Sequence, residues 1–198
     1  MLPDYILEAF RKIPANAPEG AYNGAWTSVL IHFFDIRDGY TIWPQYPVSY
    51  PIVTEEASRD TIDMVVYLTV ERNDTVVFFL ELKAEKNLTG TFSRIQADDQ
   101  MRTRIKQLYN LTPTLLLGVS AFGRKCCTYE LNKETGAITP PFVPRPQDGR
   151  FYNVVTIDQW DYNICTQEGF EKFEEVVRVA KYVGNGEQSS KFWSFFPS

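Results

Sequence analysis

Residues 75–83 read TVVFFLELK, and this stretch decides the fold that the sequence predicts. Its first part is made of Val, Phe and Leu, which pack well on a pleated surface, so we expect a strand. Because side chains alternate along a strand, Glu81 and Lys83 should share one face while Leu82 points into the core. Burying a carboxylate and an ammonium at the end of so apolar a run is costly unless both have partners. The pair is therefore a candidate functional site.

A second strand-like run precedes it at 62–71, and a short polar link at 72–74 joins the two runs. Such a link is typical of a hairpin between antiparallel strands. Asp63 opens the earlier strand, whereas Glu81 and Lys83 close the later one. The hairpin should therefore bring three residues that are distant in sequence to one place.

The rest of the chain supplies the elements around this hairpin. Apolar periodicity predicts helices in the opening segment around 6–10, over 19–34, over 93–109 and over 168–183, and strands over 40–50, 114–120 and 126–131, with a further possible strand over 151–157. The order is helix, three strands, helix, strand, followed by a hairpin strand and a closing helix. We therefore expect an α/β fold.

The 198 residues suit a single domain, with a core at about 19–131 and an extension at about 132–198. No apolar run approaches the roughly 20 residues of a membrane span. The start of the chain lacks the basic-then-apolar layout of a secretory signal, so we expect an intracellular protein, in the cytoplasm or nucleus. The three cysteines are expected to be reduced thiols. A single histidine argues against a His-based metal site or a Ser-His-Asp triad.

A net charge of −5 argues against a protein that coats nucleic acid through its overall charge. Basic residues nevertheless gather in the middle of the chain. They are Lys83, Lys86, Arg94, Arg102, Arg104, Lys106, Arg124 and Lys125. A polyanion, if one binds, is expected to bind there.

Metal chemistry would give the charged pair its partners. The carboxylates of Asp63 and Glu81, with the backbone carbonyl of Leu82, are hard oxygen ligands suited to Mg²⁺ or Mn²⁺. Lys83 beside the metal could orient the attacking water and stabilise charge that grows on a phosphate. The alternative is a surface salt bridge between Glu81 and Lys83 at the end of the strand.

An Asp at the start of one strand, Glu-x-Lys on the next and a following helix that bears Gln resemble the PD-(D/E)XK nuclease superfamily over residues 19–131. The resemblance implies an αβββαβ core with a mixed central sheet flanked by helices, here with an extra C-terminal helix, and Mg²⁺-dependent cleavage of phosphodiester bonds. Ile62 stands where the superfamily has its proline. The segments SR at 93–94, ADDQMR at 97–102 and LGVSA at 117–121 are also similar to a large group of uncharacterised proteins of mushroom-forming fungi.

The resemblance assigns roles to particular residues. It makes Asp63 the first metal ligand, Glu81 the second and Lys83 the catalytic lysine. Asp60 is a second acid that could compete for the metal-facing position.

Two further residues take roles from the helices. Glu19 is the nearest acid for an additional metal or water contact from the first helix, although a carboxylate there also suits the helix dipole. Gln100 matches the glutamine of the second helix, with Gln96 and Gln107 as alternatives.

The expected activity is metal-dependent hydrolysis of DNA or RNA by a metal-activated water, with DNA against RNA left open. The alternative is a catalytically inactive nuclease-fold module that binds protein or nucleic acid. The aromatic segment FWSFF at 192–196 either covers an edge of the core or forms a homodimer contact.

Overall fold

The computed structural model describes residues 1–44, 66–144 and 153–185. Four α-helices are present in these ranges: α1 (Asp4–Arg11), α2 (Asn23–Phe33), α3 (Thr91–Leu108) and α4 (Gln167–Gly184). The strands are β1 (Tyr40–Pro44), β2 (Val66–Arg72), β3 (Thr75–Lys83), β4 (Leu115–Phe122), β5 (Lys125–Asn132), β6 (Ala137–Thr139) and β7 (Tyr162–Asn163). Short 3₁₀ turns connect them: η1 (Glu19–Tyr22), η2 (Ile36–Asp38), η3 (Glu85–Asn87), η4 (Tyr109–Leu111) and η5 (Ile157–Gln159).

The strands form one mixed sheet in the order β1-β2-β3-β4-β5-β6, and β7 pairs with β5. Only β3 and β4 run parallel among the described pairs, and α3 is the crossover that joins them. All other pairs are antiparallel. The chain is therefore α/β with a mixed central sheet, and β3 lies inside that sheet with a neighbour on each side.

The β2–β3 hairpin turns on two residues, Asn73 and Asp74, whose φ angles are 50° and 60°. Two consecutive left-handed residues give the backbone twist that suits a two-residue hairpin, and Asn and Asp tolerate this conformation better than other side chains. Arg72 pairs with Thr75 across the turn. The predicted antiparallel hairpin is confirmed, and its turn fixes the register of β3.

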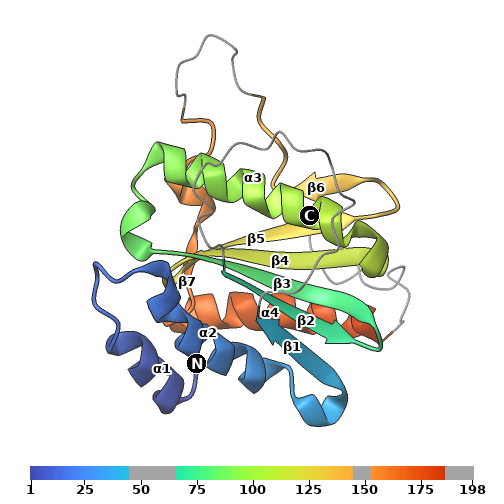
Figure 1. Ribbon diagram of the computed structural model, residues 1–198, viewed down its shortest axis with the longest axis horizontal. Helices are drawn as coiled ribbons and strands as arrows, with labels where there is room; N and C mark the ends of the chain where they lie inside the picture. The colour runs from blue at the N-terminus through green and yellow to red at the C-terminus, as the bar shows by residue number, and fades with distance from the viewer. Residues whose placement is uncertain (45–65, 145–152, 186–198) are drawn as a thin grey trace, which may run out of the picture.

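Helices cover both faces of the sheet, and Figure 1 shows α3 on one side with α1, α2 and α4 on the other. The larger apolar core lies between the sheet and α1, α2 and α4, around Trp26, Phe78 and Phe173. The smaller core lies under α3, around Phe79 and Met101. Two cores on opposite faces explain why β3 and β4 are apolar along nearly their whole length.

Over the described residues the predicted elements are confirmed with two exceptions, whereas 45–50 and 62–65 of two predicted strands, and the aromatic segment 192–196, lie outside the described residues. The possible strand at 151–157 is wrong over its described part, 153–157, because 153–156 belong to no strand and Ile157 begins η5. The carbonyl of Val155 accepts a hydrogen bond from Arg94 Nε at 2.9 Å, so a side chain takes the place of a neighbouring strand. The short strands β6 and β7 were not predicted, because strands of two or three residues carry no periodic pattern.

Two helical glycines should respond in opposite directions to alanine. A Cβ on Gly169 in α4 would lie 1.9 Å from the carbonyl oxygen of Asn163, whereas a Cβ on Gly24 in α2 would meet nothing within 4 Å. We expect Gly169→Ala to lower the free energy of unfolding by about 2 kcal/mol. Gly24→Ala should raise it by roughly 0.5 kcal/mol, because alanine favours a helix more than glycine does. Urea denaturation measures both, and a loss of stability in both variants would contradict the packing described.

Candidate active site

The candidate site is built on the last residues of β3. Leu82 is completely buried in the larger core, together with residues of α2 and α4. Glu81 and Lys83 alternate with it and lie on the opposite face, as does Phe79, which packs under α3. The predicted orientation of these three residues is confirmed.

Glu81 is completely buried, and neither of its carboxylate oxygens has a hydrogen-bond partner among the described residues. Burial raises its pKa from the usual 4.5 to about 8. The charges of Lys83 and Arg104 lower this pKa, whereas that of Glu19 raises it. A buried polar group without a partner calls for an explanation such as an ion, a water or a catalytic role.

Lys83 lies between two carboxylates. Its Nζ is 3.8 Å from Glu81 Oε1 and 3.9 Å from Glu19 Oε2. Both distances exceed those of a hydrogen bond, so the three groups interact through charge without direct hydrogen bonding between them. The Lys83 side chain is 8% exposed, so this is not the surface salt bridge considered as the alternative.

Glu19 opens η1, directly before α2, and thus enters the site from the predicted first helix. Its ion pair with Lys83 brings this acid to the candidate site, whereas its predicted contact with a metal or water remains a prediction. Its position in the first turn also suits the helix dipole, the alternative interpretation of this carboxylate.

Other polar side chains lie on the same face of the sheet. Ser120 in β4 is paired with Glu81, and Thr69 in β2 is paired with Phe79, two residues earlier along β3. Ser120 Oγ and Thr69 Oγ1 are buried without hydrogen-bond partners among the described residues. Gln100 comes from α3, and its Oε1 is also buried without such a partner. Unsatisfied polar atoms therefore occur on this face of the sheet and on α3, the helix that covers it.

The other glutamines of α3 have different surroundings. Gln107 accepts a hydrogen bond from Arg104 Nη1 at 3.3 Å, so its oxygen is engaged within the helix. Gln96 is partly buried. Of the three, Gln100 alone has a buried oxygen without a partner among the described residues, which favours it over the two alternatives.

A hydrogen-bond network fixes the end of β3 against the N-terminal helices. Glu85 Oε2 accepts hydrogen bonds from Tyr22 Oη and from Arg124 Nη1, both at 3.1 Å. Arg124 Nη2 in turn donates to the carbonyl of Phe10 at 2.7 Å, at the end of α1. Tyr22 belongs to the same turn as Glu19, so this network positions the turn that carries the site acid.

Gly123 completes the network at the β4–β5 turn. Its N–H donates to the carbonyl of Lys83 at 2.9 Å, and its carbonyl accepts from Trp26 Nε1 at 2.8 Å. Its φ is +60°, and a Cβ here would lie 2.6 Å from Glu85 Cβ and 3.0 Å from the Tyr22 ring. Glycine is required on both counts, because the conformation is left-handed and the space is filled.

Asp63 and Asp60 lie outside the described residues, as does Ile62. The proximity of Asp63 to Glu81 therefore remains a prediction. In the described ranges, no group of three or more His, Cys, Asp or Glu side chains could hold a metal ion. The described part of the site contributes the two carboxylates of Glu19 and Glu81 and the backbone of Leu82.

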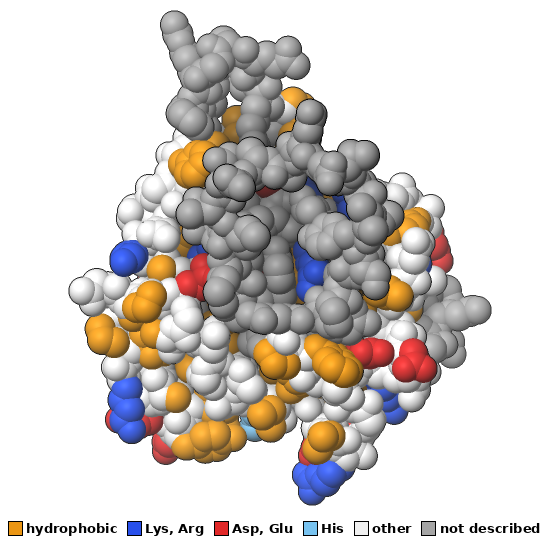
Figure 2. Space-filling model, in the orientation of Figure 1, with side chains coloured by type: hydrophobic (Ala, Val, Ile, Leu, Met, Phe, Trp, Pro, Cys, Tyr) orange, Lys and Arg blue, Asp and Glu red, His pale blue; other side chains and the backbone are white. Residues whose placement is uncertain are grey.

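Most of the basic residues in the middle of the chain have internal partners. The buried Arg94 guanidinium donates to the carbonyls of Val155 and Leu88. Arg102 pairs with Asp98 at 2.9 Å, and Arg124 is held as described above. On the face in Figure 2, the described acidic and basic side chains form small groups of mixed sign. Few of the cations counted in the sequence are thus available to a polyanion.

Sequence reasoning missed Ser120 and the network around Glu85. A lone serine in the apolar run LLLGVSAF (115–122) was a usable signal for Ser120, because a hydroxyl in a buried strand needs a reason. The contacts of Glu85 with Tyr22 and Arg124 join residues that are 39 to 63 positions apart in the sequence. No local sequence pattern indicates contacts over such separations.

Comparison with known proteins adds no relative: no family model matches the chain, and no curated protein or solved structure resembles it significantly. Among the described helices, none has the length and apolar character needed to cross a membrane. The class of protein must therefore be inferred from the site itself.

The raised pKa of Glu81 should make stability depend on pH. The folded protein holds this proton up to about pH 8, whereas the unfolded chain releases it near 4.5. The resulting stabilisation is complete below pH 4.5 and is lost as the pH rises to about 8. In EDTA, we expect Glu81→Gln to lose less stability than the parent protein between pH 5 and pH 8, by on the order of a few kcal/mol.

Urea denaturation at the two pH values provides the measurement. Glu174→Gln, at an exposed position of α4, is the matched control and should keep the pH dependence of the parent protein. Equal pH dependence in all three proteins would show that Glu81 titrates normally.

Proposed function

We propose that this chain is a metal-dependent nuclease of the PD-(D/E)XK type, which hydrolyses phosphodiester bonds of DNA or RNA. The observation that carries the proposal is Glu81, a completely buried carboxyl group without a hydrogen-bond partner among the described residues, beside a buried lysine. A divalent cation would give this group the partner it lacks.

The arrangement of elements supports the same proposal. Helix α2, strands β1, β2 and β3, helix α3 and strand β4 follow one another in the order αβββαβ. The Glu-Leu-Lys tripeptide ends β3, and the helix that follows carries Gln100 on the face of the sheet where Glu81 lies. These are the positions that the superfamily resemblance assigns to these residues.

The donor groups fit Mg²⁺ or Mn²⁺. Mg²⁺ in phosphate-processing sites is usually bound through one or two carboxylates, with water and substrate oxygens as its other ligands. Glu81 and Glu19, with the backbone carbonyl of Leu82 and the carboxylate of Asp63, would hold it. The bound cation would lower the pKa of a water molecule and stabilise negative charge on the phosphate.

The protein's own groups would orient the reactants. Lys83, placed between the carboxylates of Glu81 and Glu19, can hold an attacking water and stabilise charge that develops on a phosphate oxygen. Glu19 keeps the ammonium on the side of the site formed by η1. Gln100 can accept a hydrogen bond from water or substrate through its unsatisfied oxygen.

A second candidate function is a binding module of the same fold without catalysis. One observation favours it: with its pKa raised to about 8, Glu81 is largely protonated at neutral pH when no cation is bound. A protonated carboxyl group is a poor metal ligand. A nuclease should both bind the metal and cleave nucleic acid, whereas a binding module should not cleave.

Cleavage of nucleic acid is the direct test. We expect the protein to cleave at least one of single- and double-stranded DNA and RNA with Mg²⁺ or Mn²⁺, and not in EDTA. Lys83→Met keeps the length of the side chain without its charge, and should reduce the rate by about 100-fold or more. The exposed Lys12, at the end of α1 and outside the basic middle of the chain, gives the matched control, Lys12→Met, which should cleave as the parent protein does. Absence of cleavage on all four substrates, or cleavage unchanged in Lys83→Met, would refute catalysis.

Metal binding can be measured without any substrate. We expect Mn²⁺ to raise the melting temperature by mass action, with about 2.7 kcal/mol of stabilisation at 100 times the dissociation constant. The rise should be larger at pH 8 than at pH 6, because the cation binds the ionised carboxylate. Glu81→Gln and Asp63→Ala should abolish it, whereas Glu174→Gln should keep it. An equal rise in all variants would place the metal elsewhere.

A further inference from the structure

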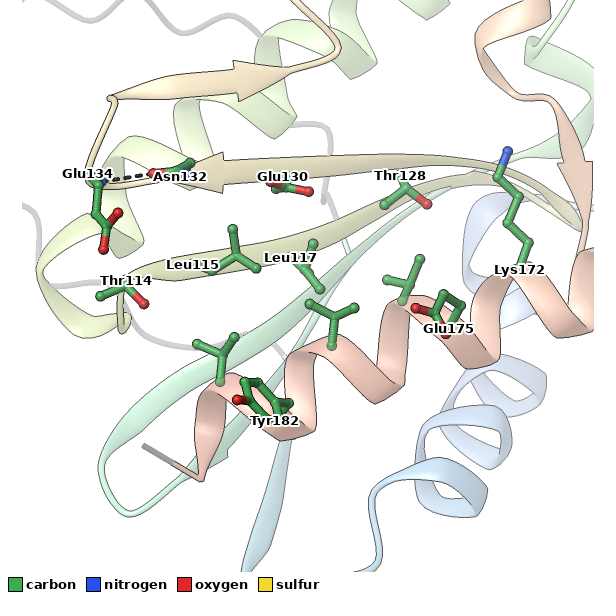
Figure 3. A pocket seen from close by; sticks show the side chains of 13 residues that line it. Thr114, Leu115, Leu117, Thr128, Glu130, Asn132, Glu134, Lys172, Glu175 and Tyr182 are labelled. Carbon is green, nitrogen blue, oxygen red and sulfur yellow. Dashed lines mark hydrogen bonds between the residues drawn. The ribbon is translucent and has the colours of Figure 1, made fainter. Parts of the chain in front are cut away.

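A groove on the other face of the sheet is separate from Glu81 and Lys83. Its volume is about 530 Å³, and it lies between β4, β5 and α4 (Figure 3). Leu117 of β4 and Glu130 of β5 are register partners, and Leu117 belongs to the larger core that α4 covers. The groove therefore opens on the α4 side, whereas the candidate active site lies under α3.

The lining of the groove is mainly aliphatic. Its apolar side chains come from two strand positions and four positions on one side of α4: Leu115, Leu117, Val176, Val179, Tyr182 and Val183. In Figure 3 the strands form one wall and α4 the other, with side chains directed into the space between them. A concave, mostly apolar space of this size is typical of a site for a small organic molecule.

Three glutamates interrupt this apolar lining: Glu130, Glu134 and Glu175. Glu130 lies near the end of β5, between Thr128 and Asn132 on the same face of the strand, and is half-buried. Burial raises its pKa, and no cation of the described residues pairs with it. Removing a carboxylate from water without giving it a partner is unfavourable, so a cation bound in the groove would stabilise Glu130.

The other three charged residues of the lining are either paired or exposed. Lys172 is paired with Asp161, and Glu175 is paired with Arg178 at 2.6 Å. Glu134 is exposed at the end of the groove beyond β5. The partly buried charge of the lining without an ion-pair partner among the described residues is thus that of Glu130.

From this cavity and this charge we infer that the groove binds an amphiphilic amine, a molecule with an apolar body and one cationic nitrogen. The apolar body packs between the valines of α4 and the leucines of β4, and the nitrogen donates a hydrogen bond to the carboxylate of Glu130. A charged hydrogen bond in a partly desolvated site contributes more than a neutral one. A neutral or anionic molecule of the same shape would leave Glu130 without its partner.

The test compares three probes of matched shape on the full chain at pH 8: 2-naphthylmethylamine, 2-naphthylmethanol and 2-naphthoate. Titrations followed by amide chemical shifts give both the affinity and the location. We expect the amine to bind about tenfold more tightly than the alcohol, with naphthoate weaker still. The shifts should map to β4, β5 and α4.

Two substitutions test the groove itself. Glu130→Gln should remove the preference for the amine over the alcohol while leaving the affinity for the alcohol unchanged. Val176→Trp, at a partly buried position of the lining, should fill the groove and block all three probes. Glu174→Gln, exposed on α4 and outside the groove, is the charge-matched control and should bind like the parent protein.

Several outcomes would overturn the inference. These are no binding of the amine, equal binding of amine and alcohol, a preference that survives Glu130→Gln, or shifts that map to the α3 face. Shifts in groove residues that appear on raising the protein concentration alone would assign the groove to a second copy of the chain, and would overturn it as well.

Discussion

The complete burial of the Glu81 carboxyl group is the constraint on which the site depends. Its position on an interior strand, beneath α3, removes it from water, and burial accordingly raises its pKa to about 8. Such a group is stable only if it is neutral, or if positive charge comes close to it. Lys83 supplies one positive charge at 3.8 Å, and the proposed cation would supply more.

This constraint connects elements that are far apart in the sequence. Ser120 is the register partner of Glu81 because β3 and β4 pair in parallel. Gln100 lies on the same side of the sheet because it belongs to α3, the crossover helix that this pairing requires. Glu19 enters because Tyr22, three residues later, is anchored to Glu85. The candidate site thus lies where β3 and β4 pair in parallel.

The two faces of the sheet have different chemistry for a physical reason. Under α3, the smaller core leaves space for polar side chains beside Glu81, several of them without partners among the described residues. On the opposite face, α2 and α4 cover the strands with a larger apolar core, and Glu130 faces a groove where that cover ends. Among the described residues, burial raises the pKa of one carboxyl group on each face, Glu81 and Glu130, and these two groups carry the two proposals.

The sequence by itself determined the strand and helix order, the β2–β3 hairpin and the shared face of Glu81 and Lys83. These follow from short-range rules, because side chains alternate along a strand and Asn73-Asp74 suits a tight turn. The sequence could not determine the burial of Glu81, its separation from Lys83, or the roles of Ser120 and Glu85. Those depend on which strand lies beside which and on how closely α3 approaches the sheet, and only the tertiary structure decides that.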